Sequence, residues 1–365
     1  MIKAKALLNY LTSKKIYFYT GVPDSILKNF TNLIDKKKKL LNIKAVNEGA
    51  AVAMAVGNYL STKKIPCVYF QNSGLGNAIN PLVSIASSKV YSIPLFLIIG
   101  WRGAPSIKDE PQHVLKGQIT PNLLKLIKIK HAVIESEKDF VKIGKILRES
   151  KKKNCTVAIL IKMNSLKNDA NKKIKKNNIK GLRRIYFIEK LLNIVPKNIK
   201  IISTTGYASR ELNYLREKNK NYPIKDFYMV GGMGHSSMVS LGVSINKKVV
   251  CLDGDGSLLM HMGSMRSVGY YGNKNYKHIL LNNGCHESVG GQITTSTGID
   301  FKKLSQSLGY KGYCFINSKI NIEKKIKSFL NSNGPTLLEV KIKIGSIENL
   351  GRPSNFLNIK NRFMK

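Results

Sequence analysis

The sequence has few acidic residues, few prolines and almost no tryptophan. Its 365 residues include 21 Asp and Glu against 61 Lys and Arg, a formal net charge of +40, with 11 Pro and 1 Trp. This charge predicts either a nucleic-acid or anionic-membrane partner or an enzyme with a cationic surface. The length of the chain predicts two or three domains, and the 43% of hydrophobic residues is enough to form their cores. A disordered, collagen-like or small disulfide-bonded protein is therefore excluded.

Cysteine pairs and long apolar runs are also missing. The five cysteines are Cys67, Cys155, Cys251, Cys285 and Cys314. Their number is odd and no C-x-x-C pair occurs, so neither a disulfide framework nor a zinc site is predicted. The apolar run at 94–101 is far below the ~20 residues of a membrane span. The N-terminus has too short an apolar stretch for a signal peptide and predicts an amphipathic helix instead. We therefore expect a cytoplasmic protein with no membrane partner.

Short β-rich runs alternate with helical patterns along the whole chain. One series of strands is predicted at 16–21, 66–74, 93–100 and 156–162, and a second at 201–206, 227–232, 249–256, 278–284 and 336–342. This alternation predicts an α/β protein with two doubly wound parallel-sheet domains. The predicted domains cover 1–163 and 185–365. A polar, basic stretch at 164–184 without apolar periodicity predicts a linker between them.

Polar and glycine-rich segments follow most of the predicted strands. They are TGVPDS, QNSGLGN, GWRGAP, TTGYAS, GGMGHSS, GDGS and NNGCHES. Because ligands of open α/β sheets bind beyond the carboxyl ends of the strands, these loops predict a binding cleft.

The strongest local signal is the run Gly254-Asp255-Gly256-Ser257, with Asn283 28 positions after Asp255. A carboxylate from Asp255, an amide oxygen from Asn283 and the backbone carbonyl of Cys285 form a set of oxygen ligands for Mg²⁺, which commonly also binds phosphate oxygens. The two glycines allow close backbone approach, and Ser257 with the following helix N-terminus can donate to a phosphate. The run GDG alone is also a common structural turn.

This arrangement resembles the diphosphate motif of thiamine-diphosphate enzymes. Glu48, at the start of the Ala-rich segment KAVNEGAAVAMAVGNYL, matches the family's cofactor-activating glutamate. The segment GGMGHSS resembles the one that supports the cofactor between its rings, with Met233 as an apolar wedge. The resemblance thus adds four cofactor contacts: Gly232, Met233, Gly234 and His235. A solvated helix-start glutamate and a core methionine are the alternative interpretations of Glu48 and Met233.

Further segments make the family resemblance more specific. They lie at 20–25, 71–82, 100–113, 116–120 and 282–292. Together they resemble the phosphonopyruvate decarboxylase family, whose nearest relatives are the sulfopyruvate decarboxylases, over residues 16 to 345. The resemblance implies two domains of the thiamine-diphosphate-binding fold, with thiamine diphosphate and Mg²⁺ as cofactors. It also implies decarboxylation of 3-phosphonopyruvate to phosphonoacetaldehyde, a step of phosphonate biosynthesis. In this family the site lies between subunits, so at least a homodimer is expected.

Residue roles follow from the same resemblance. Glu48 activates the cofactor, and burial in an apolar helix environment is expected to raise its pKa. Asp24 and His113 are the candidate proton donors and substrate contacts, with Ser25 and Gln112 as further donors. Cations are needed for the distal phosphonate, and Arg102 offers a bidentate fork while Lys116 offers a point charge. His286 and Glu287 are expected to border the substrate.

Three alternatives stay open. Sulfopyruvate differs from phosphonopyruvate mainly by one charge and one proton, so the sequence does not separate the two substrates. A carboligase is less favoured because it needs room for a second acceptor. A basic nucleic-acid-binding protein, from a different class, predicts clustered Lys and Arg interleaved with stacking aromatic residues. The basic residues are instead spread along the helices and the predicted linker.

Overall fold

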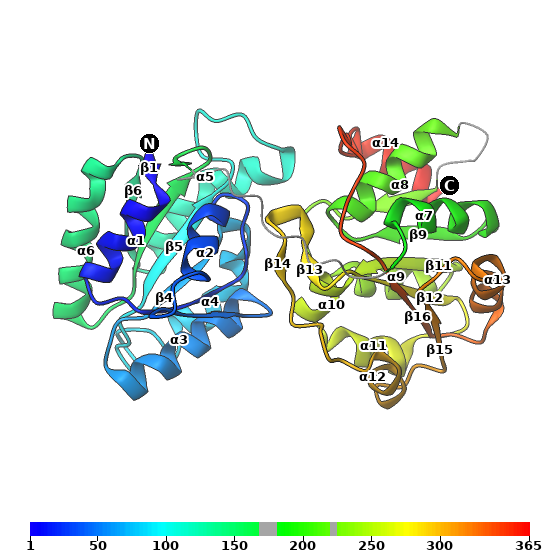
Figure 1. Ribbon diagram of the computed structural model, residues 1–365, viewed down its shortest axis with the longest axis horizontal. Coiled ribbons are helices and arrows are strands. Elements are labelled where there is room, and N and C mark those ends of the chain that lie inside the picture. Colours follow the sequence, from blue (N-terminus) through cyan, green and yellow to red (C-terminus); the bar gives the residue numbers. More distant parts are fainter. Residues whose placement is uncertain (168–180, 220–224) are drawn as a thin grey trace. The chain divides into compact units, whose positions relative to one another are not determined.

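The computed structural model describes residues 1–167, 181–219 and 225–365, and the chain forms two compact units, Met1–Ile174 and Lys175–Lys365 (Figure 1). Most of the predicted linker, 168–180, lies outside the described residues. The two described ends of the predicted linker belong to regular elements. Leu166–Lys167 forms strand β8 of the N-terminal unit, and Arg184 is the first residue of helix α7 of the C-terminal unit.

The N-terminal unit contains a six-stranded, fully parallel sheet. In sheet order its strands are β3 (Leu41–Lys44), β2 (Phe18–Gly21), β4 (Cys67–Gln71), β5 (Phe96–Trp101), β7 (Val157–Lys162) and β6 (Lys130–Ile134). Its helices are α1 (Ala4–Ser13), α2 (Lys28–Ile34), α3 (Glu48–Thr62), α4 (Leu75–Val83), α5 (Pro111–Leu126) and α6 (Phe140–Lys153). A short parallel pair joins β1 (Ile2–Lys3) to β8.

The C-terminal unit contains a second six-stranded parallel sheet. Its strands are, in sheet order, β10 (Asp226–Tyr228), β9 (Lys200–Ser203), β11 (Val249–Gly254), β12 (Tyr276–Asn282), β16 (Thr336–Lys341) and β15 (Gly312–Ile316). The helices are α7 (Arg184–Ile194), α8 (Tyr207–Lys218), α9 (Ser236–Ser244), α10 (Asp255–Met260), α11 (Ser264–Tyr271), α12 (Phe301–Ser307), α13 (Ile322–Asn331) and α14 (Phe356–Met364). An antiparallel pair, β13 (Cys285–His286) and β14 (Gln292–Ile293), follows β12.

Both sheets have the same topology. Numbered by their order in the chain, the six strands of each sheet lie in the order 2-1-3-4-6-5. The direction of winding reverses between the first and third strands, which are β2 and β4 in one unit and β9 and β11 in the other. Ligands of doubly wound sheets bind at this point, beyond the carboxyl ends of the strands. The predicted doubly wound α/β fold is confirmed, and it places a candidate site in each unit.

Each sheet is buried on both faces. In β4, Cys67 and Tyr69 belong to one apolar core while Val68 and Phe70 belong to another. The second sheet divides in the same way, with Val250 and Leu252 in one core and Val249 and Cys251 in the other. Successive side chains of a strand point to opposite faces, so helices on both sides account for the continuous apolar strands of the sequence.

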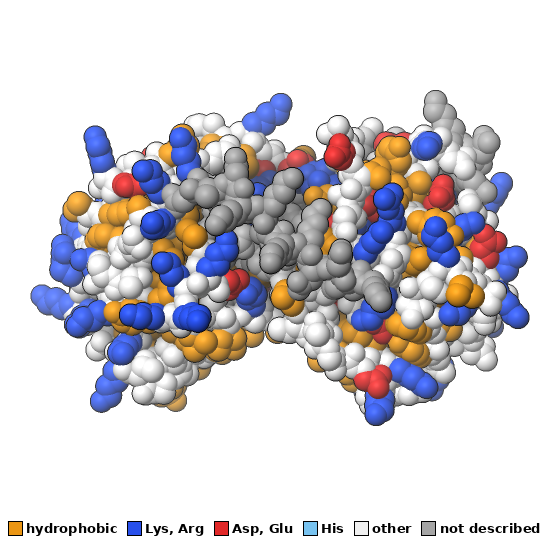
Figure 2. Space-filling view, in the orientation of Figure 1, with side chains coloured by type: hydrophobic (Ala, Val, Ile, Leu, Met, Phe, Trp, Pro, Cys, Tyr) orange, Lys and Arg blue, Asp and Glu red, His pale blue; other side chains and the backbone are white. Residues whose placement is uncertain are grey.

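Basic side chains are widely distributed on the face of the molecule that Figure 2 shows. On the face in Figure 2, Lys and Arg side chains are scattered over both units among apolar and uncharged groups. Within the described parts of the chain, no helix is both long enough and apolar enough to cross a membrane.

Candidate active site

Glu48 is a buried carboxyl group at the start of helix α3. The side chain of Asn47 caps this helix by accepting a hydrogen bond from the Ala50 N–H group (2.8 Å). Glu48 is 5% exposed, and its Oε2 accepts a hydrogen bond from Asn77 Nδ2 (2.8 Å). Burial raises the pKa of Glu48 above its usual range, although the Asn77 hydrogen bond acts in the opposite direction. The group is therefore suited to hold and release a proton nearer neutral pH.

A glycine leaves room for this carboxyl group. Gly74 lies in a single 3₁₀ turn, Asn72–Gly74, directly after β4. A Cβ atom at Gly74 would lie 2.0 Å from Glu48 Oε1. The backbone of the turn thus packs directly against the carboxyl group, and a side chain at this position would force Glu48 to move.

Asp24 is the second buried carboxyl group of the N-terminal unit. Its Oδ2 accepts hydrogen bonds from the backbone N–H groups of Ile26 (2.7 Å) and Leu27 (2.9 Å), and its Oδ1 accepts one from Gln71 Nε2 (2.7 Å). Burial raises the pKa of Asp24, while these hydrogen bonds and the charge of Arg102 lower it. The structure thus groups Asp24, Gln71 and Arg102 at the ends of β2, β4 and β5.

Arg102 is already engaged within its own loop. Asp109 accepts hydrogen bonds from Arg102 Nε (2.7 Å) and Nη2 and from the backbone N–H groups of Gly103 and Glu110 (both 2.8 Å). This pairing holds the pKa of Asp109 well below its usual range; its own burial acts in the opposite direction. Asp109 occupies the Nε and Nη2 edge of the guanidinium, so a phosphonate would approach its other edge, formed by Nη1 and Nη2.

The other predicted substrate contacts lie on or near helix α5 and α2. His113 is buried in the first turn of α5, and a Cβ atom at Gly103 would lie 1.9 Å from its carbonyl oxygen. Gln112 Oε1 is buried without a hydrogen-bond partner among the described residues. Ser25 and Lys116 are half-buried. His113 therefore lies against the Arg102 loop through its backbone carbonyl.

In the C-terminal unit, Asp255 is the first residue of α10, directly after β11. It is 2% exposed, and its Oδ2 accepts hydrogen bonds from the hydroxyl groups of Thr294 and Ser296 (2.9 Å to Ser296). The backbone N–H group of Asn283 also donates to this carboxyl group. Burial raises the pKa of Asp255 against these hydrogen bonds. The predicted pair Asp255 and Asn283 is thus brought into direct contact.

Asn283 has both ends of its amide bound. Its Oδ1 accepts a hydrogen bond from the Cys285 N–H group (3.1 Å), and its Nδ2 donates to Glu287 Oε2 (3.1 Å). Glu287 forms an ion pair with Arg184 (2.9 Å). Glu287, which the sequence predicts to border the substrate, is therefore bound by Arg184 and Asn283 within the protein.

The segment GGMGHSS meets the GDGS turn. Ser257 Oγ accepts hydrogen bonds from the Gly234 N–H group (3.1 Å) and from Thr204 Oγ1 (2.9 Å). Gly234 has a φ of +90°, and a Cβ atom there would lie 2.5 Å from the His261 ring, so glycine is required. His235 is exposed and stacks on His261, with 4.4 Å between ring centroids.

A cavity with about 510 Å³ of empty space, part of it open to solvent, lies at the ends of β9, β11 and β12. Its wall contains predicted residues from both motifs and from the loop after β12: Met233, Gly254, Asp255, Gly256, Ser257, Asn283, Cys285, His286 and Glu287. Unpredicted residues complete the wall, among them Arg184, Thr204, Thr205, Gly206 and Tyr207. Gly206 and Tyr207 place the N-terminus of the 12-residue helix α8 at this cavity, which favours an anionic ligand. Three predicted cofactor contacts, Gly232, Gly234 and His235, are not among the lining residues.

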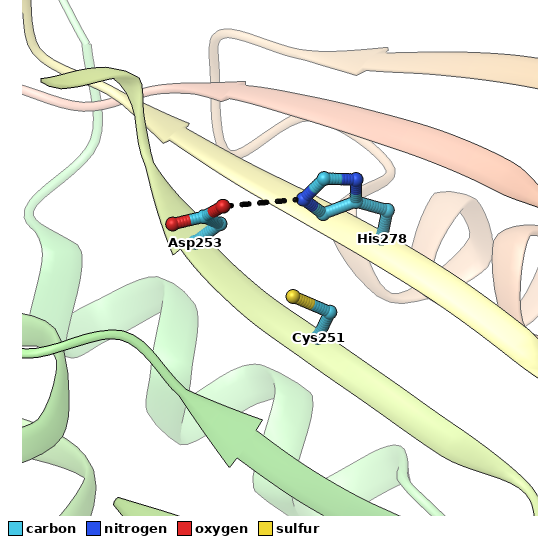
Figure 3. Close-up of side chains that lie close together, drawn as sticks. All are labelled: Cys251, Asp253 and His278. Carbon is cyan, nitrogen blue, oxygen red and sulfur yellow. Dashed lines mark ion pairs between the residues drawn. The ribbon is translucent and has the colours of Figure 1, made fainter. Parts of the chain in front are cut away.

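A buried cluster lies under the GDG turn. Cys251 and Asp253 on β11 face His278 on β12, with Asp253 Oδ2 3.6 Å from His278 Nε2 (Figure 3). Burial by itself lowers the pKa of His278, but Tyr310, Cys251 and Asp253 raise it, and the net direction is upward. Because His278 Nδ1 also bonds the Tyr310 hydroxyl and the Gly254 N–H donates to Asp253 Oδ1 (both 2.9 Å), this ion pair supports the turn.

Sequence reasoning missed several residues of these sites. Asn77, Gln71, Thr204 and Thr205 lie inside loops that the sequence pattern singled out, but nothing in the pattern gave them a role. Arg184 is one of two adjacent arginines at the end of the basic stretch predicted as a linker. Its burial and pairing with Glu211 and Glu287 depend on contacts far along the chain.

Two family models match the chain. The thiamine pyrophosphate enzyme N-terminal TPP binding domain matches residues 1–125, and the C-terminal TPP binding domain matches residues 204–340. A phosphonopyruvate decarboxylase of Streptomyces viridochromogenes is 33% identical over 97% of this chain and 91% of its own length. One from Streptomyces hygroscopicus is 33% identical over 97% and 90%. A sulfopyruvate decarboxylase of Methanosarcina acetivorans is 26% identical over 89% and 87%.

Proposed function

The chain belongs to the phosphonopyruvate decarboxylase family of thiamine-diphosphate-dependent enzymes, and on this premise we propose that it converts 3-phosphonopyruvate to phosphonoacetaldehyde and CO₂. In this reaction the bond between C1 and C2 breaks, the carboxylate leaves as CO₂, and C2 takes up a proton. The cavity at Asp255 and Asn283 is the observation that carries the proposal.

The charges of the cavity wall support a divalent cation there. Its charged side chains are one cation, Arg184, and two carboxylates, Asp255 and Glu287. The two carboxylates would repel a diphosphate unless a cation lay between the carboxylates and the phosphates. Asp255 and Asn283 supply the carboxylate and amide oxygens that Mg²⁺ prefers, and the Cys285 carbonyl is the proposed third ligand. The residues present therefore fit Mg²⁺ together with a diphosphate.

Residues of the wall and of the adjoining segment GGMGHSS fit the rest of the cofactor. Ser257, Gly256 and the N-terminus of α8 would bind the diphosphate, and Met233 with Gly232, Gly234 and His235 would support the rings. Bound thiamine diphosphate supplies the electron sink that accepts the electron pair left when the carboxylate departs. The protein's part is to orient this group, exclude water and move protons.

Three side chains of the N-terminal unit are proposed to move those protons. Glu48 would hold a proton on its carboxyl group and exchange it with the bound cofactor, for which its raised pKa suits it. Asp24 and His113 are proposed to protonate C2 and contact the substrate carboxylate. Ser25, Gln112, Arg102 and Lys116 are the proposed contacts of the distal phosphonate, with Arg102 using the guanidinium edge that faces away from Asp109.

A homo-oligomer is part of the proposal. Two Methanocaldococcus jannaschii proteins similar to separate parts of this chain are named subunits alpha and beta of sulfopyruvate decarboxylase, so those proteins act as an assembly. We propose that this chain is at least a dimer, with residues of two copies completing each site. Size-exclusion chromatography with light scattering tests this statement.

Substrate comparison tests the function directly. Purified protein loaded with thiamine diphosphate and Mg²⁺ is expected to release CO₂ from phosphonopyruvate with a kcat/KM at least tenfold above that for sulfopyruvate or pyruvate. A coupled aldehyde reductase measures the second product. Equal or greater kcat/KM with sulfopyruvate would assign the chain to that substrate, and no CO₂ from either would overturn the proposal.

Replacing Gly74 by alanine tests the packing around Glu48. Because the new Cβ would lie 2.0 Å from Glu48 Oε1, the carboxyl group must move. Misplacement of a catalytic group by about 1 Å costs about 100-fold in rate, and overpacking costs about 1–3 kcal/mol of stability. We expect kcat to fall roughly 10- to 100-fold and the free energy of unfolding in urea to fall by about 1–3 kcal/mol. Gly57→Ala is the matched control and should retain activity. Gly57 lies on helix α3, as Glu48 does, and nothing lies within 4 Å of the new Cβ.

A further inference from the structure

Glu287 has contacts that a residue merely bordering the substrate does not need. It lies in a 3₁₀ turn, Glu287–Val289, and its side chain is 12% exposed. Oε2 accepts hydrogen bonds from Asn283 Nδ2 (3.1 Å) and Arg184 Nη1 (2.9 Å), and Oε1 accepts one from the Gly345 N–H group (2.6 Å). Both oxygens of Glu287 are thus fixed by the protein.

This carboxylate decides the orientation of the neighbouring amide. An ionised carboxylate only accepts hydrogen bonds, whereas an asparagine amide can present either its NH₂ or its oxygen. Asn283 must therefore turn its NH₂ toward Glu287, since the reverse orientation would set two oxygens against each other. Its Oδ1 is then on the other side, where the Cys285 N–H group donates to it. An amide binds a metal through this oxygen.

Arg184 in turn fixes Glu287. Its guanidinium is buried, and Nε donates to Glu211 Oε2 (2.9 Å), which is itself fully buried on α8. The ion pair of Arg184 and Glu211 joins the first residue of α7 to α8. It thereby fixes the guanidinium group that binds Glu287. The orientation of Asn283 is therefore set by a chain of buried contacts from two helices.

We propose that Glu287, held by Arg184, is a positioning residue that turns the Asn283 amide so that Oδ1 serves the divalent cation. The inference rests on the proposed function of the cavity. It differs from the predicted role of Glu287 as a substrate neighbour, because Glu287 acts through Asn283 on metal affinity. Partners that orient metal ligands typically change metal affinity by 10- to 100-fold.

Mn²⁺ binding tests the proposal without a reaction. Full-length protein with saturating thiamine diphosphate is titrated with Mn²⁺, and unbound Mn²⁺ is followed by electron paramagnetic resonance. Glu287→Leu keeps a side chain of similar size but offers no acceptor to Asn283 Nδ2, so the dissociation constant for Mn²⁺ is expected to rise about 10- to 100-fold. Glu189→Gln, on the exposed face of α7, is the control and should match the unmodified protein.

A polarity exchange separates positioning from a general structural role. Asn283→Asp sets two carboxylates against each other, and we expect weak Mn²⁺ binding. Adding Glu287→Gln to that variant restores a donor facing an acceptor, so the double variant is expected to bind Mn²⁺ at least tenfold more tightly than Asn283→Asp alone. A double variant that binds Mn²⁺ no more tightly than Asn283→Asp alone would overturn the proposal, as would a Glu287→Leu constant within twofold of the unmodified protein. Unmodified protein that binds no Mn²⁺ with thiamine diphosphate would instead overturn the proposed function of the cavity.

Discussion

Replacing Glu48 by glutamine is expected to lower kcat by about 10²- to 10⁴-fold, the usual contribution of one general acid–base group. The amide keeps the shape of the carboxyl group and can still accept the hydrogen bond from Asn77 Nδ2, but it cannot exchange a proton. Single-turnover CO₂ release measures the loss. Cofactor retention, followed by fluorescence or circular dichroism, is expected to change much less than kcat.

Stability separates this loss from misfolding. Burial raises the folded pKa of Glu48 above its unfolded value, so the stability associated with the protonated form is present at low pH and declines as pH rises through the folded pKa. The glutamine variant does not titrate. We therefore expect Glu48→Gln to be as stable as the unmodified protein near pH 4, below the ordinary glutamate pKa of about 4.3, and relatively more stable near pH 8, as measured by urea unfolding.

The matched control is an exposed glutamate of the same unit. Glu135 has a 57% exposed side chain paired with Lys162, and surface pairs of this kind contribute about 0–1 kcal/mol. Glu135→Gln should retain full turnover. Full turnover in Glu48→Gln would contradict the assigned role, whereas a fall in both variants would point to an effect of lost charge rather than of proton exchange.

Replacing Asp255 by asparagine is expected to have the second largest effect, on cofactor retention. The change removes a negative ligand from the proposed cation site while keeping its size, and Thr294 and Ser296 can still donate to the amide oxygen. We expect the apparent dissociation constant for thiamine diphosphate with Mg²⁺ to rise at least about 100-fold, beyond the 10- to 100-fold typical of supporting residues. Isothermal titration calorimetry measures it.

Folding of this variant is expected to be intact. Burial raises the pKa of Asp255, so the ionised carboxylate costs stability in the cofactor-depleted protein as pH rises through the folded pKa, and the amide removes that cost. Circular dichroism and urea unfolding of cofactor-depleted protein check this point. Unchanged cofactor binding by a folded Asp255→Asn protein would show that the cation and diphosphate bind elsewhere.

Much of this protein could be predicted from its sequence because local patterns carried the signal. Buried parallel strands read as continuous apolar runs, so all four strands predicted for the first unit and all five predicted for the second are present. The family resemblance seen in the motifs is confirmed by relatives that match almost the whole chain. Of the two six-stranded sheets, the strands that were missed are β3, β6 and β15, which lie at sheet edges, where exposed positions interrupt the apolar pattern. The two-residue strands of the pairs β1 with β8 and β13 with β14 were also not predicted.

Within the site, the sequence by itself determined which turns carry chemistry. The runs around Glu48, Asp255 and Asn283 have residue types whose chemistry and spacing can be read locally. Tertiary structure alone decided what surrounds them. Gly74 packs against Glu48, Arg102 forms an ion pair with Asp109, and Arg184 forms ion pairs with both Glu211 and Glu287. These contacts join residues distant along the chain, and many Lys and Arg residues of this basic protein look alike in the sequence. Burial and a specific carboxylate partner, which only the fold supplies, distinguish the arginines that hold the site from those on the surface.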